Sequence, residues 1–274
     1  MRLWIAAICI LLGAPLAQAE TNAFAPRELE RDGRKVWLYV PASGEPSALV
    51  VVPPAGGSLL TAPELIEDDR VEHTPYVDAG FAVVSFQIAG ELRGRVTPDQ
   101  VRQAMVSFTA ARDGVANAQG AIDLALAEVP ALTGKPIFAA GHSSAANLVL
   151  ALAAEEPRIR AAVAYAPVAD TEEFIKDGPL EKVATEVPGA LDLARAFSPV
   201  NLAPRLDVPL LLFHAEDDDV APIAGTRKLA KLLAARGKPP QLVIVKSGGH
   251  YDSMIAQGLN TGILWLRKQL DTGK

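Results

Sequence analysis

Cysteine is almost absent from this chain of 274 residues, because Cys9 is the only one. One cysteine cannot form a disulfide within the chain, so no disulfide framework supports the fold, and a cysteine-based metal site is excluded too. The four histidines also lack metal-ligand spacings such as H-E-x-x-H; they are His73, His142, His214 and His250. We therefore expect no metal and no other cofactor.

Positive charge is scarcer than negative charge. The 26 Lys and Arg residues against 32 Asp and Glu residues leave a formal net charge of −6, and the isoelectric point is near 5.3. With no basic cluster anywhere, this balance argues against nucleic acid as a partner. Half of the residues are hydrophobic and 21% are charged, which is ordinary for a globular protein with a large core. We expect one domain over residues 20–274.

A long hydrophobic run occurs only at the start of the chain. Met1-Arg2 is followed by an apolar stretch over residues 3–13 and by Ala17-Gln18-Ala19, which has the A-x-A pattern of a cleavage site. The run is too short for a comfortable membrane span, so an uncleaved anchoring helix is the disfavoured alternative. We predict a signal peptide over residues 1–19 and a mature protein in the periplasm or secreted, without stable membrane insertion.

Short apolar runs alternate with helical patterns through the rest of the chain. Asp32-Gly33 between the first two runs is typical of a hairpin turn, so we expect the sheet to begin antiparallel. The later alternation predicts a mostly parallel, doubly wound α/β sheet of about eight strands. The strands are expected at 27–31, 35–40, 48–52, 81–87, 137–140, 161–166, 208–214 and 241–246, and helices at 71–79, 98–128 (with a break at Asp113-Gly114), 146–154, 223–236 and 253–270.

Residues 169–207 form an insertion with weak helical patterns at 172–176, 181–185 and 191–197. We predict that this insertion is a small helical lid, which would select the substrate.

The strand at 137–140 ends in Gly141-His142-Ser143-Ser144-Ala145 and passes directly into a helix. Strand, sharp turn and helix with a serine at the turn is the context of a nucleophile elbow. The strained turn needs small residues two positions either side of the serine, and Gly141 and Ala145 satisfy this. Ser143 is therefore the candidate nucleophile.

Two later strand ends supply partners for such a serine. Asp217, Asp218 and Asp219 follow one strand, and His250 follows the next after a glycine turn. A serine hydroxyl needs a base to take its proton, an imidazole has a suitable pKa, and a carboxylate fixes the imidazole tautomer. Each residue alone could be an ordinary loop residue, but together and in this order they predict a catalytic triad.

The strand at 48–52 ends in Pro53-Pro54-Ala55-Gly56-Gly57, where the glycines let the backbone approach a substrate. A tetrahedral oxyanion needs two backbone N–H donors. We predict that Ser144 and Gly56 donate them, with Ala55 as the next choice for the second donor.

The segment 198–222, which begins Ser198-Pro-Val-Asn and contains Pro-Leu-Leu-Leu-Phe-His214 and the three aspartates, carries a family resemblance. It is similar to the prolyl-oligopeptidase and dienelactone-hydrolase branches of the α/β-hydrolase superfamily, which read S-P-…-P-L-L-x-H-G-x-x-D-x-x-x-P. The resemblance covers essentially the whole mature chain and implies that Asp218 is the catalytic acid.

Three departures from these relatives shape the expected function. Pro-Pro-Ala-Gly-Gly stands where relatives often have His-Gly-Gly, and Ser143 stands where dienelactone hydrolases use cysteine. We also expect no N-terminal propeller, which a full-length prolyl oligopeptidase would have. The resemblance therefore implies a serine hydrolase of small carboxylic esters. The alternatives are a serine peptidase acting on short peptides and a non-catalytic extracytoplasmic binding protein on the same fold.

Overall fold

The computed structural model describes residues 26–56, 60–63, 70–93, 97–176, 181 and 186–270. The predicted signal peptide and Gly57 lie outside these residues. Among the helices of the described part, none is both long and apolar enough to cross a membrane.

One sheet of eight strands runs through the molecule in the order β1-β2-β4-β3-β5-β6-β7-β8. β1 and β2 form an antiparallel hairpin, β2 also pairs antiparallel with β4, and the other neighbouring strands are parallel. The predicted sheet is therefore confirmed. The strands are β1 (Arg27–Arg31), β2 (Arg34–Tyr39), β3 (Leu49–Val51), β4 (Ala82–Phe86), β5 (Ile137–His142), β6 (Ile159–Tyr165), β7 (Leu210–Ala215) and β8 (Gln241–Val245).

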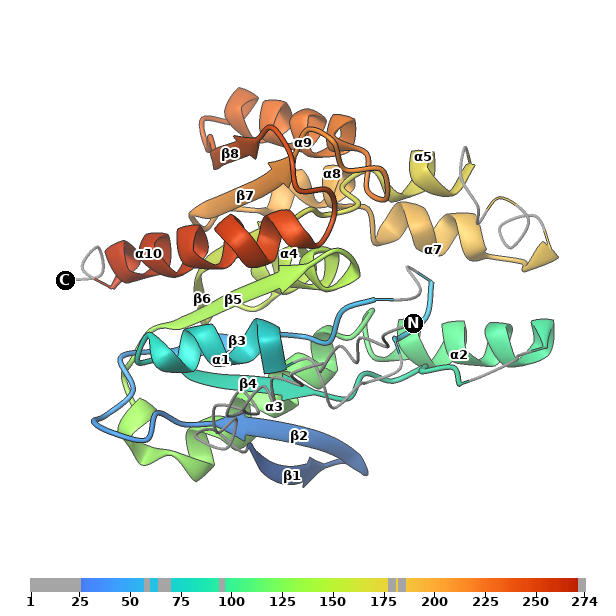
Figure 1. The fold of residues 1–274 in the computed structure, drawn as a ribbon. Helices are drawn as coiled ribbons and strands as arrows, with labels where there is room; N and C mark the ends of the chain where they lie inside the picture. The colour runs from blue at the N-terminus through green and yellow to red at the C-terminus, as the bar shows by residue number, and fades with distance from the viewer. Residues whose placement is uncertain are drawn as a thin grey trace, which may run out of the picture.

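Helices cover both faces of this sheet, as the continuous apolar runs of the central strands require. Figure 1 shows α1 (Arg70–Asp78) and α10 (Leu259–Gln269) in front of the sheet and α3 (Val115–Glu128) and α4 (Ser144–Glu155) behind it. Neighbouring residues of one strand pack in the cores on opposite faces of the sheet, because side chains alternate along a strand. Val50 packs in the core under α1 and α10, whereas Val51 packs in the core under α3 and α4.

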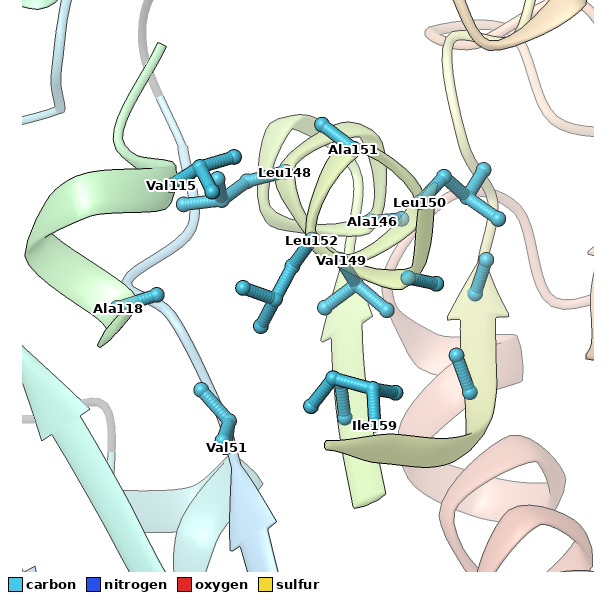
Figure 2. Packing of buried hydrophobic residues seen from close by; sticks show 14 of the residues in the cluster. Val51, Val115, Ala118, Ala146, Leu148, Val149, Leu150, Ala151, Leu152 and Ile159 are labelled. Atoms are coloured by element: carbon cyan, nitrogen blue, oxygen red, sulfur yellow. The ribbon is translucent and has the colours of Figure 1, made fainter. Parts of the chain in front are cut away.

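Helix α4 is almost entirely buried, which explains its run of Ala, Leu and Val. Figure 2 shows Val149 and Leu152 pointing from α4 toward the sheet, near Ile159 of β6, while Leu148 lies toward Val115 of α3. Burying each such side chain contributes about 1.5–3 kcal/mol. The packing holds the first turn of α4, and with it the preceding serine, against the end of β5.

The long helical stretch at 98–128 is interrupted where the sequence predicts. α2 (Pro98–Ala110) ends before Arg112, Asp113 and Gly114, which all have positive φ, and α3 begins at Val115. A left-handed backbone cannot continue a right-handed helix, so the chain changes direction there.

The insertion at 169–207 contains α5 (Thr171–Lys176), α7 (Ala190–Ala196) and the short α8 (Pro199–Leu202); residues 182–185 of the predicted middle piece lie outside the described residues. α8 was not predicted, although Pro199 stands at the first helical position, which proline favours. The buried Ser198 ties the insertion together, because its Oγ accepts from Thr171 N–H (3.1 Å) and donates to the Ala169 carbonyl (3.2 Å).

The remaining elements complete the two layers. The predicted helix at 253–270 begins as a π-helical turn, Met254–Gly258, and continues as α10. α9 (Ile223–Ala235) lies between β7 and β8 in the chain, and two 3₁₀ turns occur at Pro130–Leu132 and Ala203–Arg205.

Candidate active site

Three predicted residues follow three strands that run in the same direction. Ser143 comes directly after β5, Asp218 follows β7 and His250 follows β8. β5, β6, β7 and β8 are parallel neighbours, so their carboxyl ends meet at one edge of the sheet. Ligands of doubly wound sheets bind at this edge.

Ser143 adopts a strained backbone, with φ 57° and ψ −122°. Its N–H still bonds to the Tyr165 carbonyl of β6 at 2.9 Å, so the strain is confined to the turn. A Cβ placed on Gly141 would lie 2.8 Å from the backbone carbon and oxygen of Ala145. The close passage of β5 and α4 therefore requires glycine at position 141, as the elbow pattern implies.

Asp218 and His250 are in direct contact. Asp218 Oδ2 lies 2.8 Å from His250 Nδ1, and the Asp218 side chain is fully buried whereas that of His250 is 14% exposed. A carboxylate can only accept a hydrogen bond, so the imidazole carries its proton on Nδ1. Nε2 is then the ring nitrogen that can accept a proton from a serine.

The buried carboxylate of Asp218 receives four hydrogen bonds. Oδ1 accepts from the N–H groups of Val220 (2.9 Å) and Ala221 (2.8 Å), and Oδ2 faces His250 and His214 (3.1 Å). Burial by itself raises the pKa of Asp218, but the bonds from His214, His250 and the two amides hold that pKa well below its usual value. Asp218 is therefore ionised at neutral pH.

His214, at the buried end of β7, contacts the Asp218 carboxylate, and the sequence alone did not predict this contact. Its Nε2 lies near two acceptors, the Ala221 carbonyl (2.9 Å) and Asp218 Oδ2, so Nε2 carries the proton. Nδ1 then accepts from the Thr226 hydroxyl at 2.8 Å. Its position four residues before Asp218, at the end of β7, is the only sequence signal for this contact.

His142, inside the elbow, contacts the backbone of the catalytic loop. Its Nε2 lies 2.9 Å from the main-chain oxygen of His250, and the two imidazole rings are 4.5 Å apart between centroids. Burial, followed by the proximity of His250, lowers the pKa of His142 to about 4, so the ring is neutral at neutral pH. The sequence alone did not predict that His142 would contact the backbone of His250.

The predicted oxyanion donors lie beside each other. Ser144 is the first residue of α4, where a helix leaves its N–H without an intrahelical partner. Gly56 N–H donates to Ser144 Oγ at 3.2 Å, and the same hydroxyl lies 3.3 Å from the Gly56 carbonyl. The loop after β3 is thus attached to the elbow through the Ser144 side chain.

His73 and, in the insertion, Glu172 of α5 have local partners. His73 Nδ1 lies 3.2 Å from the Tyr39 hydroxyl, and burial lowers the pKa of His73 to about 4. Glu172 pairs with Lys176 and Arg195. Within the described ranges, no group of three or more His, Cys, Asp or Glu residues is arranged to hold a metal ion.

Residues 73–271, most of the chain, match the prolyl oligopeptidase family. The chain belongs to this family. It therefore lies in the α/β-hydrolase superfamily, which confirms the superfamily resemblance that the segment around the three aspartates carries.

Solved structures share the fold at low identity. Acylaminoacyl peptidase from Pyrococcus horikoshii matches with 16% identity and a TM-score of 0.73, over 91% of this chain and 42% of the peptidase. TT1662 from Thermus thermophilus matches with 21% identity and a TM-score of 0.65, over 90% of this chain and 98% of TT1662. Est1E from Butyrivibrio proteoclasticus matches with 16% identity and a TM-score of 0.58, over 89% of this chain and 98% of Est1E. The chain thus spans about two fifths of the peptidase and nearly all of the two smaller proteins.

Proposed function

We propose that this member of the prolyl oligopeptidase family is an extracytoplasmic serine hydrolase that cleaves small carboxylic esters through Ser143, His250 and Asp218. The observation that carries the proposal is the 2.8 Å contact between Asp218 and His250 Nδ1, at the sheet edge where the strained Ser143 turn lies. A buried carboxylate on one ring nitrogen leaves the other as a base, which is what a serine nucleophile requires.

The reaction is a two-step acyl transfer. His250 Nε2 takes the proton of Ser143 Oγ as the oxygen attacks the ester carbonyl carbon. The N–H groups of Ser144 and Gly56 stabilise the oxyanion of the tetrahedral intermediate. His250 then protonates the leaving alcohol, and the ester bond breaks to give the acyl-enzyme. Water, deprotonated by His250, attacks that acyl group and releases the acid and the free serine.

A small apolar cavity beside the elbow supports a short acyl group. It has a volume of about 10 Å³, and its lining includes Pro54, Ile88, Phe108, Ser144, Leu148 and Phe197. A space of that size holds roughly one water molecule. Phe108 of α2 and Phe197 of the insertion line it and pack edge to face, with ring centroids 5.7 Å apart. An acetyl methyl group fits such a space, so we expect short acyl groups to be preferred.

The second candidate function is hydrolysis of short peptides. The family match and the structural likeness to acylaminoacyl peptidase favour it, and the same three residues would cleave an amide. An amide needs stronger protonation of its leaving group by His250 than an ester does.

The experiment that tests the proposal is intact-mass analysis of the protein after treatment with a fluorophosphonate, beside a Ser143→Ala variant. We expect one adduct on the wild type and none on the variant. A wild type that takes no adduct would refute the hydrolase assignment and favour the binding-protein alternative.

A panel of p-nitrophenyl acetate, butyrate and octanoate against short peptide p-nitroanilides then separates the two substrate classes. We expect the acetate ester to have the highest kcat/KM. Higher kcat/KM on the anilides would select the peptidase instead.

The proposed compartment has its own test. We expect the exported protein to begin at Glu20, and terminal sequencing of the extracytoplasmic fraction measures this. An uncleaved chain that stays in the cytosol would contradict the localisation without affecting the triad.

A further inference from the structure

We propose that Asp217 is a positioning residue, which holds the loop of His250 so that the imidazole ring faces Asp218. This inference rests on the proposed function, because it assigns a task within the same triad. The two neighbouring carboxylates have different partners. Asp218 bonds to the imidazole ring of His250, and Asp217 bonds to the backbone of the two glycines that precede His250.

The carboxylate of Asp217 spans two consecutive amides of the His250 loop. Its Oδ2 accepts from Gly248 N–H at 3.2 Å and its Oδ1 accepts from Gly249 N–H at 2.8 Å. Hydrogen bonds to a charged acceptor are stronger than those between neutral groups. Two such hydrogen bonds side by side fix both the orientation of the glycine turn and its distance from β7.

Ser253 completes the hydrogen bonding of the same turn from the other side. Its N–H donates to the Gly248 carbonyl at 2.9 Å, and its hydroxyl donates to the Gly249 carbonyl at 2.7 Å. All four backbone polar groups of the two glycines therefore have partners. The N–H groups depend on Asp217, and the carbonyl groups depend on Ser253.

The glycine turn needs this support because glycine does not restrict its own backbone. Gly248 and Gly249 have φ values of 119° and 59°, and a Cβ on Gly248 would lie 2.9 Å from Ser253. The position thus requires glycine, which has the largest number of accessible backbone conformations. Without Asp217, we expect the turn to sample conformations in which His250 Nδ1 moves away from Asp218.

Asp219 provides a matched control in the same loop. It is exposed, as Asp217 is, but no hydrogen bond or ion pair of its side chain is found among the described residues. Asp217→Asn and Asp219→Asn make the same chemical change and remove the same charge. In Asp217→Asn the amide group points one N–H at a backbone N–H, so one of the two bonds is replaced by a repulsive contact.

The test compares the wild type, Asp217→Asn and Asp219→Asn in ester hydrolysis and in the rate of modification by a fluorophosphonate. We expect both kcat and the modification rate to fall about tenfold in Asp217→Asn, because a displaced base slows both reactions. KM should stay within about twofold, since Asp217 bonds to the backbone of the loop. Asp219→Asn should match the wild type in all three quantities.

A spectroscopic measurement separates positioning from general stability. The Nδ1 proton that His250 donates to Asp218 should give a low-field proton resonance in the wild type and in Asp219→Asn, and a weakened or broadened one in Asp217→Asn at a temperature where circular dichroism shows a folded protein. If Asp217→Asn does not fold, Asp217→Ser, which keeps one acceptor, is judged by the same kcat and resonance criteria.

The outcomes distinguish this inference from the proposed function. A wild type without a fluorophosphonate adduct means that the proposed function fails. A wild type that reacts, together with an Asp217→Asn variant that keeps wild-type kcat and the resonance, overturns the role of Asp217 alone. Equal losses in Asp217→Asn and Asp219→Asn also overturn it, because the loss would then follow from charge and not from the two hydrogen bonds.

Discussion

Replacing Asp218 with asparagine changes one oxygen for an NH₂ group in a fully buried position, and its effect can be worked out atom by atom. The amide oxygen can keep the two bonds from the N–H groups of Val220 and Ala221. The NH₂ group then takes the place of Oδ2 and faces His250 Nδ1 and His214 Nε2, which both carry protons when an aspartate is present. His250 can relieve the contact only by moving its proton to Nε2.

The wrong tautomer removes the base, because Nε2 is the nitrogen that must accept the proton of Ser143. We expect kcat to fall by about 10⁴-fold, as tautomer errors do in serine hydrolases. At about 1.36 kcal/mol for each factor of ten, this is about 5 kcal/mol of lost transition-state stabilisation. The free energy of unfolding should fall by less, about 1–3 kcal/mol, which leaves the variant folded.

The assay is ester hydrolysis at neutral pH with urea unfolding measured in parallel, and Ser143→Ala sets the background from contaminating hydrolases. The structure predicts a graded series for the change to asparagine: the largest loss at position 218, a smaller one at 217 and almost none at 219. A loss at Asp218 below tenfold, or equal losses at all three aspartates, would refute the assignment of Asp218 as the acid.

Three further predictions concern the fold and the acyl cavity. Gly141→Ala places a Cβ 2.8 Å from the Ala145 backbone, so we expect about 1–3 kcal/mol less stability in urea unfolding and a loss of kcat; unchanged values would show that α4 can move away from β5 freely. Asp113 is half-buried, and burial, followed by the nearby Glu155, raises its pKa to about 6. Its ionised form therefore costs stability that grows as the pH rises from about 4 to 6. Asp113→Asn should stabilise the protein by about 1 kcal/mol at pH 8 and not at pH 4, and a gain that is equal at both pH values would contradict this reasoning. Phe197→Ala removes one ring from the cavity wall, so the ratio of kcat/KM for octanoate to that for acetate should rise about tenfold or more; an unchanged ratio would mean that acyl chains bind elsewhere.

Local sequence patterns determined the elements of this fold because each pattern reflects a local physical requirement. The helical stretch at 98–128 was expected to break at Asp113-Gly114, and the left-handed backbone from Arg112 to Gly114 confirms it. The small residues around Ser143 predicted a tight elbow because only Gly141 leaves room for the Ala145 backbone. The family of the chain was also readable from its sequence, in the segment around the three aspartates.

Only the tertiary structure decided what each polar side chain touches. Three consecutive aspartates are indistinguishable as residue types, and the path of one loop sends the first to the Gly248-Gly249 amides, the second to His250 and the third to solvent. These partners lie more than thirty positions later in the chain. The contacts of His142 and His214 with the site arise in the same way. A local pattern reports backbone preference and burial, whereas a hydrogen bond between distant segments depends on how the strands are ordered and where their loops meet.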